Sequence, residues 1–220
     1  MPRAFTERER GLIGKQLLEQ GYRFFSAYGL RKANVEEIAK AAGISKGAFY
    51  NFYDSKESLF MDVVEQVEAR IRQKVLVIID LPGPSPRARL FAVLKKTLAL
   101  FRTMPILQVF TGSDFDLLFR RLPAEKLQEH LARDRAFFEE LIARCQSAGI
   151  PIRAQPERIM GLLYLVVLAV LHEDDLGRNE FVDSTDLLLD LVAAFCLGEV
   201  EIPSQEPVSP VPDPERANPI

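Results

Sequence analysis

The sequence is poor in the residues that build covalent or metal-stabilised frameworks. Its 220 residues include no tryptophan, two histidines and two cysteines. Cys145 and Cys196 lie far apart and have no Cys or His neighbour at ligand spacing, which argues against a disulfide framework or a zinc site. We therefore expect two buried, reduced thiols.

A long apolar segment is also missing. The most apolar run, residues 159–171, is too short for a membrane-spanning helix, which needs about 20 residues. The N-terminus is charged and lacks the apolar segment of a signal peptide. These features predict a cytoplasmic protein with no membrane partner.

No segment has the spacing of a catalytic or cofactor site. We find no Ser/His/Asp order, no glycine-rich phosphate loop and no metal-ligand spacing. Residues 172–175 read His-Glu-Asp-Asp, but consecutive helical positions point in different directions, so a helix-end charge cluster fits better than a metal site. His130 lies among charged residues and is expected to be solvated. We predict that the protein is not an enzyme and uses no cofactor or metal.

Positive charge is scarce overall but concentrated at the N-terminus. The net charge is −3. Residues 1–56 hold ten Lys/Arg and six Asp/Glu, which gives +4, and the rest holds eighteen and twenty-five, which gives −7. A positive head on a negative body indicates that only the head meets phosphate.

Residues 34–56, NVEEIAKAAGISKGAFYNFYDSK, predict two short helices joined by a tight turn and followed by the start of a third. Asn34 can cap the first helix. Gly43 is suited to end it, because glycine enters the left-handed region at little cost. Ser45 can cap the second helix and Asp54 the third. This arrangement is typical of a helix-turn-helix.

The second of these helices, expected at 46–53, has the chemistry of a DNA-reading helix. Small residues let its backbone approach a groove, and its ammonium, hydroxyl and amide groups can donate to phosphates or base edges. Its exposed candidates are Lys46, Gly47, Ala48, Tyr50 and Asn51, whereas Phe49, Phe52 and Tyr53 should pack inward. Lys56 opposes the dipole of the next helix, which suggests a nearby phosphate. The pattern alone also fits a three-helix packing element without a DNA role.

The segment from Val35 to Phe60 resembles the tetracycline-repressor (TetR) family of bacterial regulators. It combines IA-x-x-AG-[IV]-S-x-G-x-[FL]-Y with S-K-E-x-L at the family spacing, and Phe25 and Gly29 precede it in F-SAY-G. The resemblance covers about the first quarter of the chain and is highly specific. It implies a DNA-binding protein and an all-helical fold.

The resemblance also assigns roles to individual residues. It implies a recognition helix carrying Ser45, Lys46, Ala48, Tyr50 and Asn51, a phosphate contact at Lys56 and a DNA-backbone contact at Asn34. Two positions depart from the family pattern. Ala33 replaces a threonine and loses a hydroxyl contact, and Tyr53 replaces a phenylalanine and adds a hydroxyl that needs a partner if the ring is buried.

Helical periodicity extends through most of the chain, and no alternating strand pattern of useful length appears. We predict further helices at 6–28, 56–79, 86–103, 106–120, 123–148, 156–175 and 183–198. The predicted fold is all-α, with an N-terminal three-helix helix-turn-helix DNA-binding domain at 1–56 and a C-terminal helical effector-binding and dimerisation domain at 57–200. A proline-rich tail follows at 201–220.

The last two predicted helices are apolar on more than one face, and such helices need partners on all sides. Two-fold packing in a homodimer would supply those partners, although simple core helices would also fit. The family resemblance implies the homodimer. The candidate interface residues are Leu162, Leu165, Val166, Ala169, Leu188, Leu191, Val192 and Phe195.

The middle of the chain is rich in aromatic residues, among which the resemblance implies a pocket for a small apolar or aromatic effector. Aromatic residues at helical spacing often belong to the core instead. The candidate pocket residues are Phe101, Met104, Gln108, Phe110, Thr111, Phe115, Phe119 and Tyr164, of which Gln108, Thr111 and Tyr164 could supply polar contacts.

These inferences lead to a functional hypothesis with one rival. The leading hypothesis is a dimeric transcriptional regulator, a repressor that a small, largely apolar effector releases from operator DNA. The rival is a DNA-binding dimer without small-molecule input, controlled by a protein partner or by abundance. An enclosed cavity in the body favours the first, and a filled core favours the second.

Overall fold

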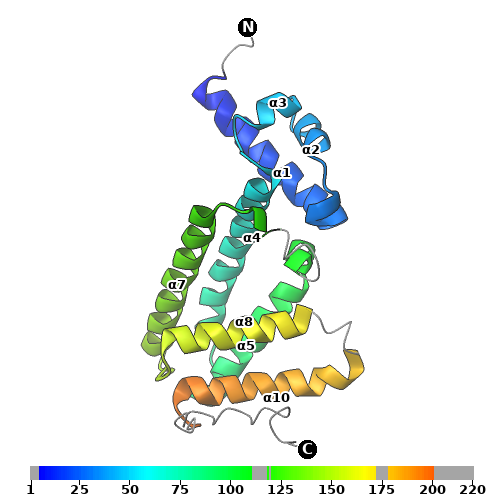
Figure 1. The fold of residues 1–220 in the computed structure, drawn as a ribbon. Coiled ribbons are helices and arrows are strands. Elements are labelled where there is room, and N and C mark those ends of the chain that lie inside the picture. Colours follow the sequence, from blue (N-terminus) through cyan, green and yellow to red (C-terminus); the bar gives the residue numbers. More distant parts are fainter. Residues whose placement is uncertain (1–4, 111–117, 119, 172–177, 201–220) are drawn as a thin grey trace, which may run out of the picture.

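A computed structural model describes residues 5–110, 118, 120–171 and 178–200, and all its regular elements are helices. Figure 1 shows a small N-terminal head joined to a larger body. The head contains α1 (Glu7–Lys32), α2 (Val35–Ala41), α3 (Lys46–Phe49) and the first turns of α4 (Lys56–Ile79). The body contains the rest of α4 with α5 (Pro86–Arg102), η1 (Pro105–Phe110), α7 (Ala124–Ser147), α8 (Pro156–Leu171) and α10 (Arg178–Leu197). The predicted all-α fold is confirmed.

The head is held together by a small aromatic core. The Phe25 and Phe60 rings meet edge to face with centroids 5.2 Å apart, and both side chains are fully buried. A Cβ atom at Gly21 would lie only 3.1 Å from a Val63 methyl, so α1 crosses α4 where its side chain is smallest. The first turns of α4 are therefore part of the head core.

The short helices of the head are fixed by side-chain caps. The Asn34 carboxamide oxygen accepts from the Glu36 amide at 2.9 Å, and the Ser45 hydroxyl accepts from the Ala48 amide at 3.1 Å, as expected. The predicted Asp54 cap is wrong, because Ser55 starts α4 and accepts from the Ser58 amide at 3.1 Å.

The second motif helix is shorter than predicted. Regular α-helix ends at Phe49, after which the hydrogen bonds shift to a tighter pattern. The Asn51 amide donates to the Ala48 carbonyl at 3.1 Å, and the Phe52 amide donates to the Phe49 carbonyl at 2.9 Å. These three-residue turns bring Phe49 into the core and carry the chain toward α4.

The helix α4 runs unbroken from the head into the body. Val67, Ile71, Val75 and Ile79 are buried at four-residue spacing, so they form one continuous stripe along the body half of the helix. The predicted bounds of this helix, 56–79, are confirmed. One rigid element thus belongs to both cores.

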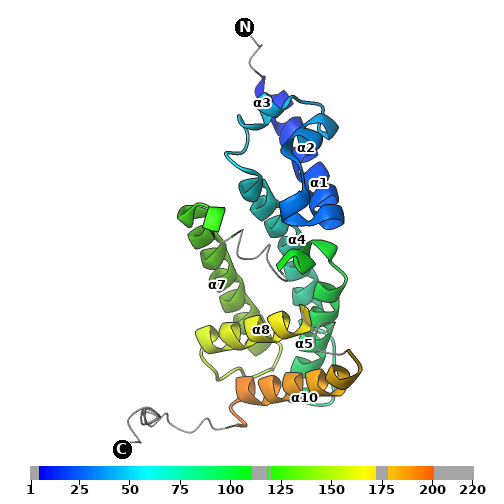
Figure 2. The same ribbon diagram turned by 45° about the vertical axis from the view of Figure 1, so that its right-hand side comes forward.

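The body packs α5 and α7 beside α4, while α8 and α10 run across them (Figures 1 and 2). Arg89 of α5 ties three segments together. Its guanidinium donates to the Ala148 carbonyl at 2.6 Å, to the Ile79 carbonyl at 3.1 Å and to the Leu81 carbonyl at 3.2 Å. It therefore satisfies carbonyls at the C-terminal ends of both α4 and α7.

Most other body predictions are close to the observed elements. The helices predicted at 86–103 and 123–148 are α5 and α7, with ends that differ by one residue. The helix predicted at 106–120 begins instead as the 3₁₀ segment η1 at Pro105. Residues 111–117 and 119 of that prediction, the tail at 201–220 and the charge cluster at 172–175 lie outside the described residues. No helix in the described part of the chain is long and apolar enough to cross a bilayer.

The turn between α2 and α3 depends on Gly43, whose φ is 77°. Its Cβ position is open, so replacement of Gly43 by alanine introduces backbone strain without a steric clash. We expect Gly43→Ala to lower the free energy of unfolding by about 1 kcal/mol in urea titrations. Gly14→Ala is the matched control, because Gly14 lies inside α1 with the same free space. We expect that control to be neutral or stabilising, and an equal loss in both variants would contradict the assignment.

Candidate nucleic-acid interface and body cavity

Of the motif residues predicted to meet DNA, those of α3 lie at the outer end of the head, whereas Asn34 lies in the turn between α1 and α2, nearer the body (Figure 1). Those with exposed side chains or backbone are Asn34, Ser45, Lys46, Gly47, Tyr50 and Asn51, whereas Ala48 is half-buried. Phe49 is fully buried, and Phe52 and Tyr53 are half-buried, as expected. The arrangement presents small and polar groups outward and aromatic groups inward.

Lys56 has a role inside the chain that the sequence did not indicate. Its ammonium group donates to the Arg31 carbonyl at 3.0 Å and to the Ala33 carbonyl at 3.1 Å. These carbonyls belong to the C-terminal end of α1, which carries partial negative charge. The position of this lysine at the start of α4 is therefore explained without a phosphate.

The start of α1 braces the end of the recognition segment. The Arg10 guanidinium donates to the Asn51 carbonyl at 3.2 Å and lies over the Phe52 ring, 5.1 Å from its centroid. The Phe5 and Phe52 ring centroids are 5.9 Å apart. Arg10 thus holds the turn after α3 in place.

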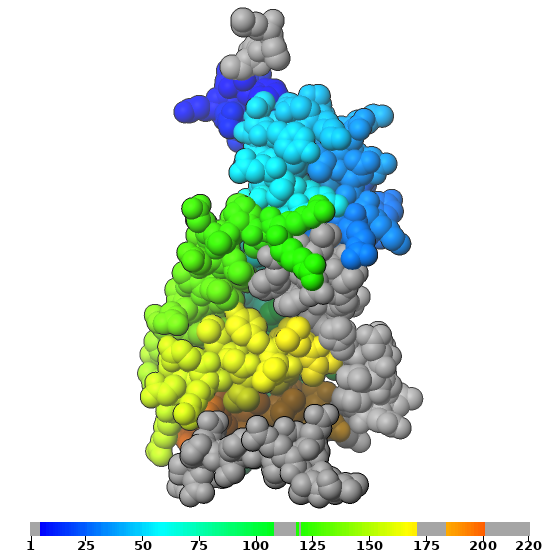
Figure 3. Space-filling view, viewed as in Figure 1, coloured from blue at the N-terminus to red at the C-terminus, as the bar shows by residue number. Residues whose placement is uncertain are grey.

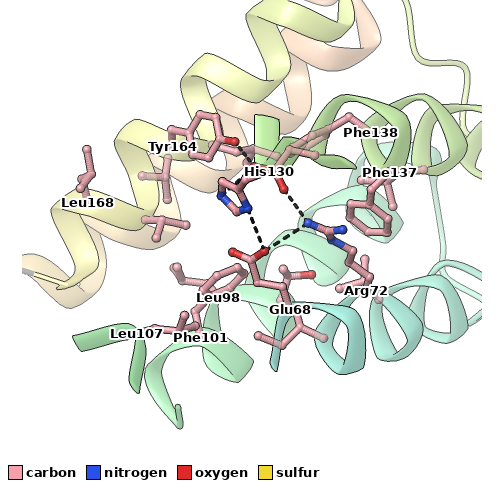
Figure 4. A pocket seen from close by; sticks show the side chains of 18 of the residues that line it. Glu68, Arg72, Leu98, Phe101, Leu107, His130, Phe137, Phe138, Tyr164 and Leu168 are labelled. Atoms are coloured by element: carbon pink, nitrogen blue, oxygen red, sulfur yellow. Dashed lines mark hydrogen bonds and ion pairs between the residues drawn. The ribbon is translucent and has the colours of Figure 1, made fainter. Parts of the chain in front are cut away.

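A second candidate site is a cavity of about 420 Å³ in the body, lined by α4, α5, α7 and α8 and partly open to the surface. Most of its lining is aliphatic or aromatic, including Leu98, Phe101, Phe137 and Phe138 (Figure 4). Of the predicted pocket residues, Phe101 and Tyr164 line it, while Met104 packs against the core without lining it. Thr111, Phe115 and Phe119, and the side chains of Gln108 and Phe110, lie outside the described part.

One end of the cavity carries a charged cluster that bridges three helices (Figure 4). Arg72 of α4 contacts Asp134 of α7 at 2.6 Å and Glu68, one turn before it, at 3.2 Å. The other Asp134 oxygen accepts from the Tyr164 hydroxyl of α8. The Arg72 guanidinium also lies over the Phe137 ring, 5.4 Å from its centroid. Both oxygens of Asp134 are therefore engaged.

His130 completes the cluster from α7. Its Nδ1 lies 2.7 Å from Oε1 of Glu65 and 3.8 Å from Oε2 of Glu68, and its Nε2 lies 3.7 Å from Asp134. The side chain is only 15% exposed, so the prediction that His130 is solvated is wrong. Of its charged neighbours in sequence, Asp134 faces inward with it, whereas the Glu129 side chain is 63% exposed.

The surroundings shift the pKa values of these groups in different directions. Burial raises the pKa of Glu68 to about 7, with smaller opposing effects from His130 and Arg72. Burial alone would lower the pKa of His130, but the Glu65 hydrogen bond and the nearby carboxylates outweigh it and raise that pKa. Burial would raise the pKa of Glu65, but hydrogen bonds from His130 and Arg133 lower it. The cluster therefore holds exchangeable protons near neutral pH.

The sequence reasoning missed this cluster, although its signal was present. Glu65, Glu68 and Arg72 recur at spacings of three and four on α4, and His130 and Asp134 are four apart on α7. Such spacings place side chains on one helical face. A charged stripe on one face of each helix was therefore the available inference.

Glu65, Glu68 and His130 each bring one possible metal-ligand atom within 4.8 Å of the others. Glu65 is also bound by Arg133 at 2.9 Å, and Glu68 by Arg72 at 3.2 Å. The acids are thus balanced by arginines of the chain itself, and we assign no metal to the cluster.

The first turn of α7 also touches the head. Lys126 contacts Asp62 of α4 at 2.6 Å and lies 6.0 Å from the centroid of the Tyr53 ring. Burial raises the pKa of Tyr53, and the charge of Asp62 and a hydrogen bond to it raise it further. The tyrosine hydroxyl that departs from the family pattern therefore has a partner. The helix α7 thus contacts both the cavity cluster and the loop that follows the recognition segment.

The outer faces of α8 and α10 carry a group of exposed leucines. Leu165 is 65% exposed, Leu187 62% and Leu191 48%. Of the predicted dimer residues, Leu165, Ala169, Leu188 and Leu191 are exposed, Leu162 and Phe195 are half-buried, and Val166 and Val192 are buried in the core of the chain itself. Figure 3 shows α8 forming a broad part of the body surface.

The pKa shifts of Glu68 and His130 predict the pH dependence of stability. The folded state holds the Glu68 proton more tightly than the unfolded chain, so the free energy of unfolding falls as pH rises from 4.5 to about 7. Protonation of His130 stabilises the fold at low pH, and that contribution is also lost as pH rises through its raised pKa.

We therefore expect the free energy of unfolding to fall between pH 5 and pH 7 by about 1–2 kcal/mol less in Glu68→Gln than in the wild type. Urea unfolding at several pH values measures this difference. Glu157→Gln, at an acid 57% exposed on α8, is the matched control and should leave the pH slope unchanged. Equal slopes in the wild-type protein and Glu68→Gln would contradict the assigned ionisation of the cavity.

Comparison with known proteins agrees with this geometry. Residues 17–63 match the profile of bacterial regulatory proteins of the tetR family. An uncharacterised helix-turn-helix transcriptional regulator of Bacillus subtilis, YuxN, is 36% identical over 73 residues, which are 33% of this chain and 25% of that protein. The chain thus spans about a quarter of the length of this relative.

Solved structures extend the similarity to the whole fold. The fatty acid degradation regulator FadR of Bacillus halodurans has a TM-score of 0.56 at 18% identity, over 89% of this chain and 97% of that one. FadR of Bacillus subtilis, solved in complex with stearoyl-CoA, has a TM-score of 0.56 at 16% identity, over 85% and 99% of the two chains. At this identity the likeness concerns the fold. The match over residues 17–63 places the helix-turn-helix domain of this chain in the TetR family of transcriptional regulators.

Proposed function

We propose that the protein is a homodimeric, ligand-responsive repressor that binds operator DNA through its head and releases it when a small effector occupies the body cavity. Residues 1–56 would form the DNA-binding domain, residues 57–200 the effector-binding and dimerisation domain, and residues 201–220 a tail. The observation that carries the proposal is that α4 and α7 line the cavity and also contact the head. A ligand that shifts either helix therefore has a direct mechanical connection to the DNA-binding surface.

The cavity favours this proposal over a regulator without small-molecule input. Its volume of about 420 Å³ and largely apolar lining suit a small ligand, since such sites commonly measure about 300–1,000 Å³. A regulator controlled only by abundance has no need of a largely apolar cavity beside its main connecting helix. FadR of Bacillus subtilis, which shares the fold, was solved with stearoyl-CoA, which further supports a ligand-binding body.

The exposed leucines of α8 and α10 support a homodimer. Leu165, Leu187 and Leu191 present apolar area that a second copy would cover through the same two helices. A two-fold dimer also places two recognition helices on one side of the molecule, about 34–36 Å apart for successive major grooves. The interface residues that remain candidates are the exposed Leu165, Ala169, Leu188 and Leu191.

Release would follow from a difference in affinity. A ligand that binds more tightly to one arrangement of α4 and α7 shifts the population toward that arrangement. The contact of Lys126 with Asp62 and Tyr53 would carry the shift to the end of the recognition segment. Reciprocity requires that operator DNA weaken ligand binding by the same factor.

The DNA-binding face is tested with Lys46→Ala and Tyr50→Ala. The operator is first recovered by selection from a random duplex pool, and affinities are then measured by fluorescence anisotropy at several salt concentrations. Loss of a phosphate contact at Lys46 should reduce the slope of log affinity against log salt by about 0.9. Loss of the Tyr50 contact should weaken binding by about 1 kcal/mol or more.

Lys96→Ala is the matched control, since it removes the same charge from an exposed position on α5 in the body. It should leave the slope nearly unchanged. Lys56 is unsuited to this test because its ammonium group holds the end of α1. The assigned face is contradicted if Lys46→Ala and Tyr50→Ala bind the operator with wild-type affinity and salt slope.

The link between cavity and head is tested with the neutral apolar fluorophore N-phenyl-1-naphthylamine. We expect saturating operator DNA to lower the affinity of the wild-type protein for this probe by about fivefold or more. The double variant Tyr53→Phe/Lys126→Gln should bind the probe normally but lose most of that effect, because the α7 contact with the head is removed. Glu129→Gln, at a position on α7 that is 63% exposed, is the control.

Two results would count against this link. Identical probe affinities with and without operator would contradict a ligand-responsive regulator. A full operator effect in the double variant would contradict only the route through Lys126.

A further inference from the structure

The cavity has one polar end, and the charged groups there are not all equivalent. The groups that line the cavity are Glu68, Arg72, His130 and Asp134, with the Tyr164 hydroxyl on Asp134. The rest of the lining is almost entirely apolar (Figure 4). A ligand that fills the cavity must therefore place its body among hydrocarbon groups and its end against this cluster.

Arg72 is already committed to carboxylates of the chain. The same nitrogen contacts Asp134 at 2.6 Å and Glu68 at 3.2 Å, and the guanidinium lies over the Phe137 ring. An anionic ligand would have to displace one of these acids and would then lie beside both. Because like charges repel strongly in a partly desolvated site, the arginine is a poor anchor for an anion.

Of the carboxylates in the cluster, Glu68 has the weakest counter-charge. It shares Arg72 with Asp134, which receives the shorter contact and a further hydrogen bond from Tyr164. The nearest nitrogen of His130 is 3.8 Å away and is engaged at 2.7 Å by Glu65 instead. Burial consequently holds the pKa of Glu68 at about 7, so its charged form lacks a full counter-charge.

We propose that the cavity binds a lipophilic organic cation, an ammonium group on an apolar body, with Glu68 as the counter-ion and the nearby aromatic rings as the cation's other neighbours. This inference rests on the proposed function of the cavity as the effector site and names the chemical class of effector. The faces of Phe101, Phe137, Phe138 and Tyr164 can add cation–π attraction, which is strongest where water is excluded.

Binding of a cation has a consequence for protons. The charged or titratable groups around Glu68 are Glu65 and Arg72 on α4, His130 and Asp134 on α7 and Tyr164 on α8. A cation beside Glu68 favours its ionised form, as an opposite charge lowers a carboxyl pKa by about 1–3. Near pH 7 the cation should therefore release a fraction of a proton, and its affinity should rise as pH increases from 6 to 8.

The test compares three ligands that share one ten-carbon chain: decyltrimethylammonium, decan-1-ol and decanoate. Isothermal titration calorimetry of the full-length protein at pH 7 should give the cation an affinity at least about tenfold above those of the alcohol and the acid. The cation titration is then repeated in phosphate and in Tris, two buffers that take up protons with different heats. Proton release appears as a difference between the binding heats in the two buffers.

Glu68→Gln should reduce the affinity for the cation by about tenfold and abolish the proton release, while the affinity for the alcohol stays the same. Glu157→Gln, at the exposed acid on α8, should behave as the wild type. Since the comparison of the three ligands uses the wild-type protein, the outcome does not depend on whether Glu68→Gln folds.

The possible results separate this inference from the proposed function. Tighter binding of decanoate or of decan-1-ol than of the cation overturns the cation assignment and leaves a ligand-binding cavity in place. Binding of the cation that does not depend on pH or on Glu68 also overturns it. Failure of all three ligands to bind counts against the cavity as an effector site and removes the basis of the inference.

Discussion

The structure depends on one helix that is buried in two cores. The first turns of α4 supply Phe60 and Val63 to the head, and its later turns supply Ile71 and Val75 to the body. Because the helix is continuous, a sharp kink would break its own hydrogen bonds, so a displacement at one end is transmitted to the other. The position of the DNA-binding head relative to the body is therefore a property of what packs against α4.

The cluster of charges between α4 and α7 lies in a part of the body where apolar side chains could pack instead. Replacing buried ion pairs by well-packed apolar groups is often neutral or stabilising, so such groups are weak evidence of a stability role. Here they line a cavity, and Glu68 holds its proton near neutrality. We interpret the cluster as the recognition end of a ligand site, which also joins the two helices that reach the head. Lys126, one turn before His130, makes the second connection between α7 and α4.

The sequence predicted local features well and long-range ones poorly. The caps at Asn34 and Ser45, the turn at Gly43 and the bounds of α4 follow from residues within a few positions of one another, and the structure confirms them. The role of Lys56 was missed because its partners lie 25 and 23 residues away. His130 was misplaced because its surroundings come from α4, more than 60 residues earlier. When the partners of a polar residue are distant in sequence, the only signal in the sequence is a spacing of three or four that places side chains on one helical face. That spacing also fits a solvated surface.

The central claim is that filling the cavity changes how two heads are held. It is tested most directly by pulsed electron paramagnetic resonance on a dimer spin-labelled at Lys40→Cys, an exposed position on α2, with the buried Cys145 and Cys196 left in place. With operator DNA, the account predicts a narrow distribution of label distances that matches recognition helices about one DNA turn, roughly 34–36 Å, apart. Adding N-phenyl-1-naphthylamine to the DNA-free protein should move the distribution away from that value. An identical distribution in the free, operator-bound and probe-bound states would contradict the account.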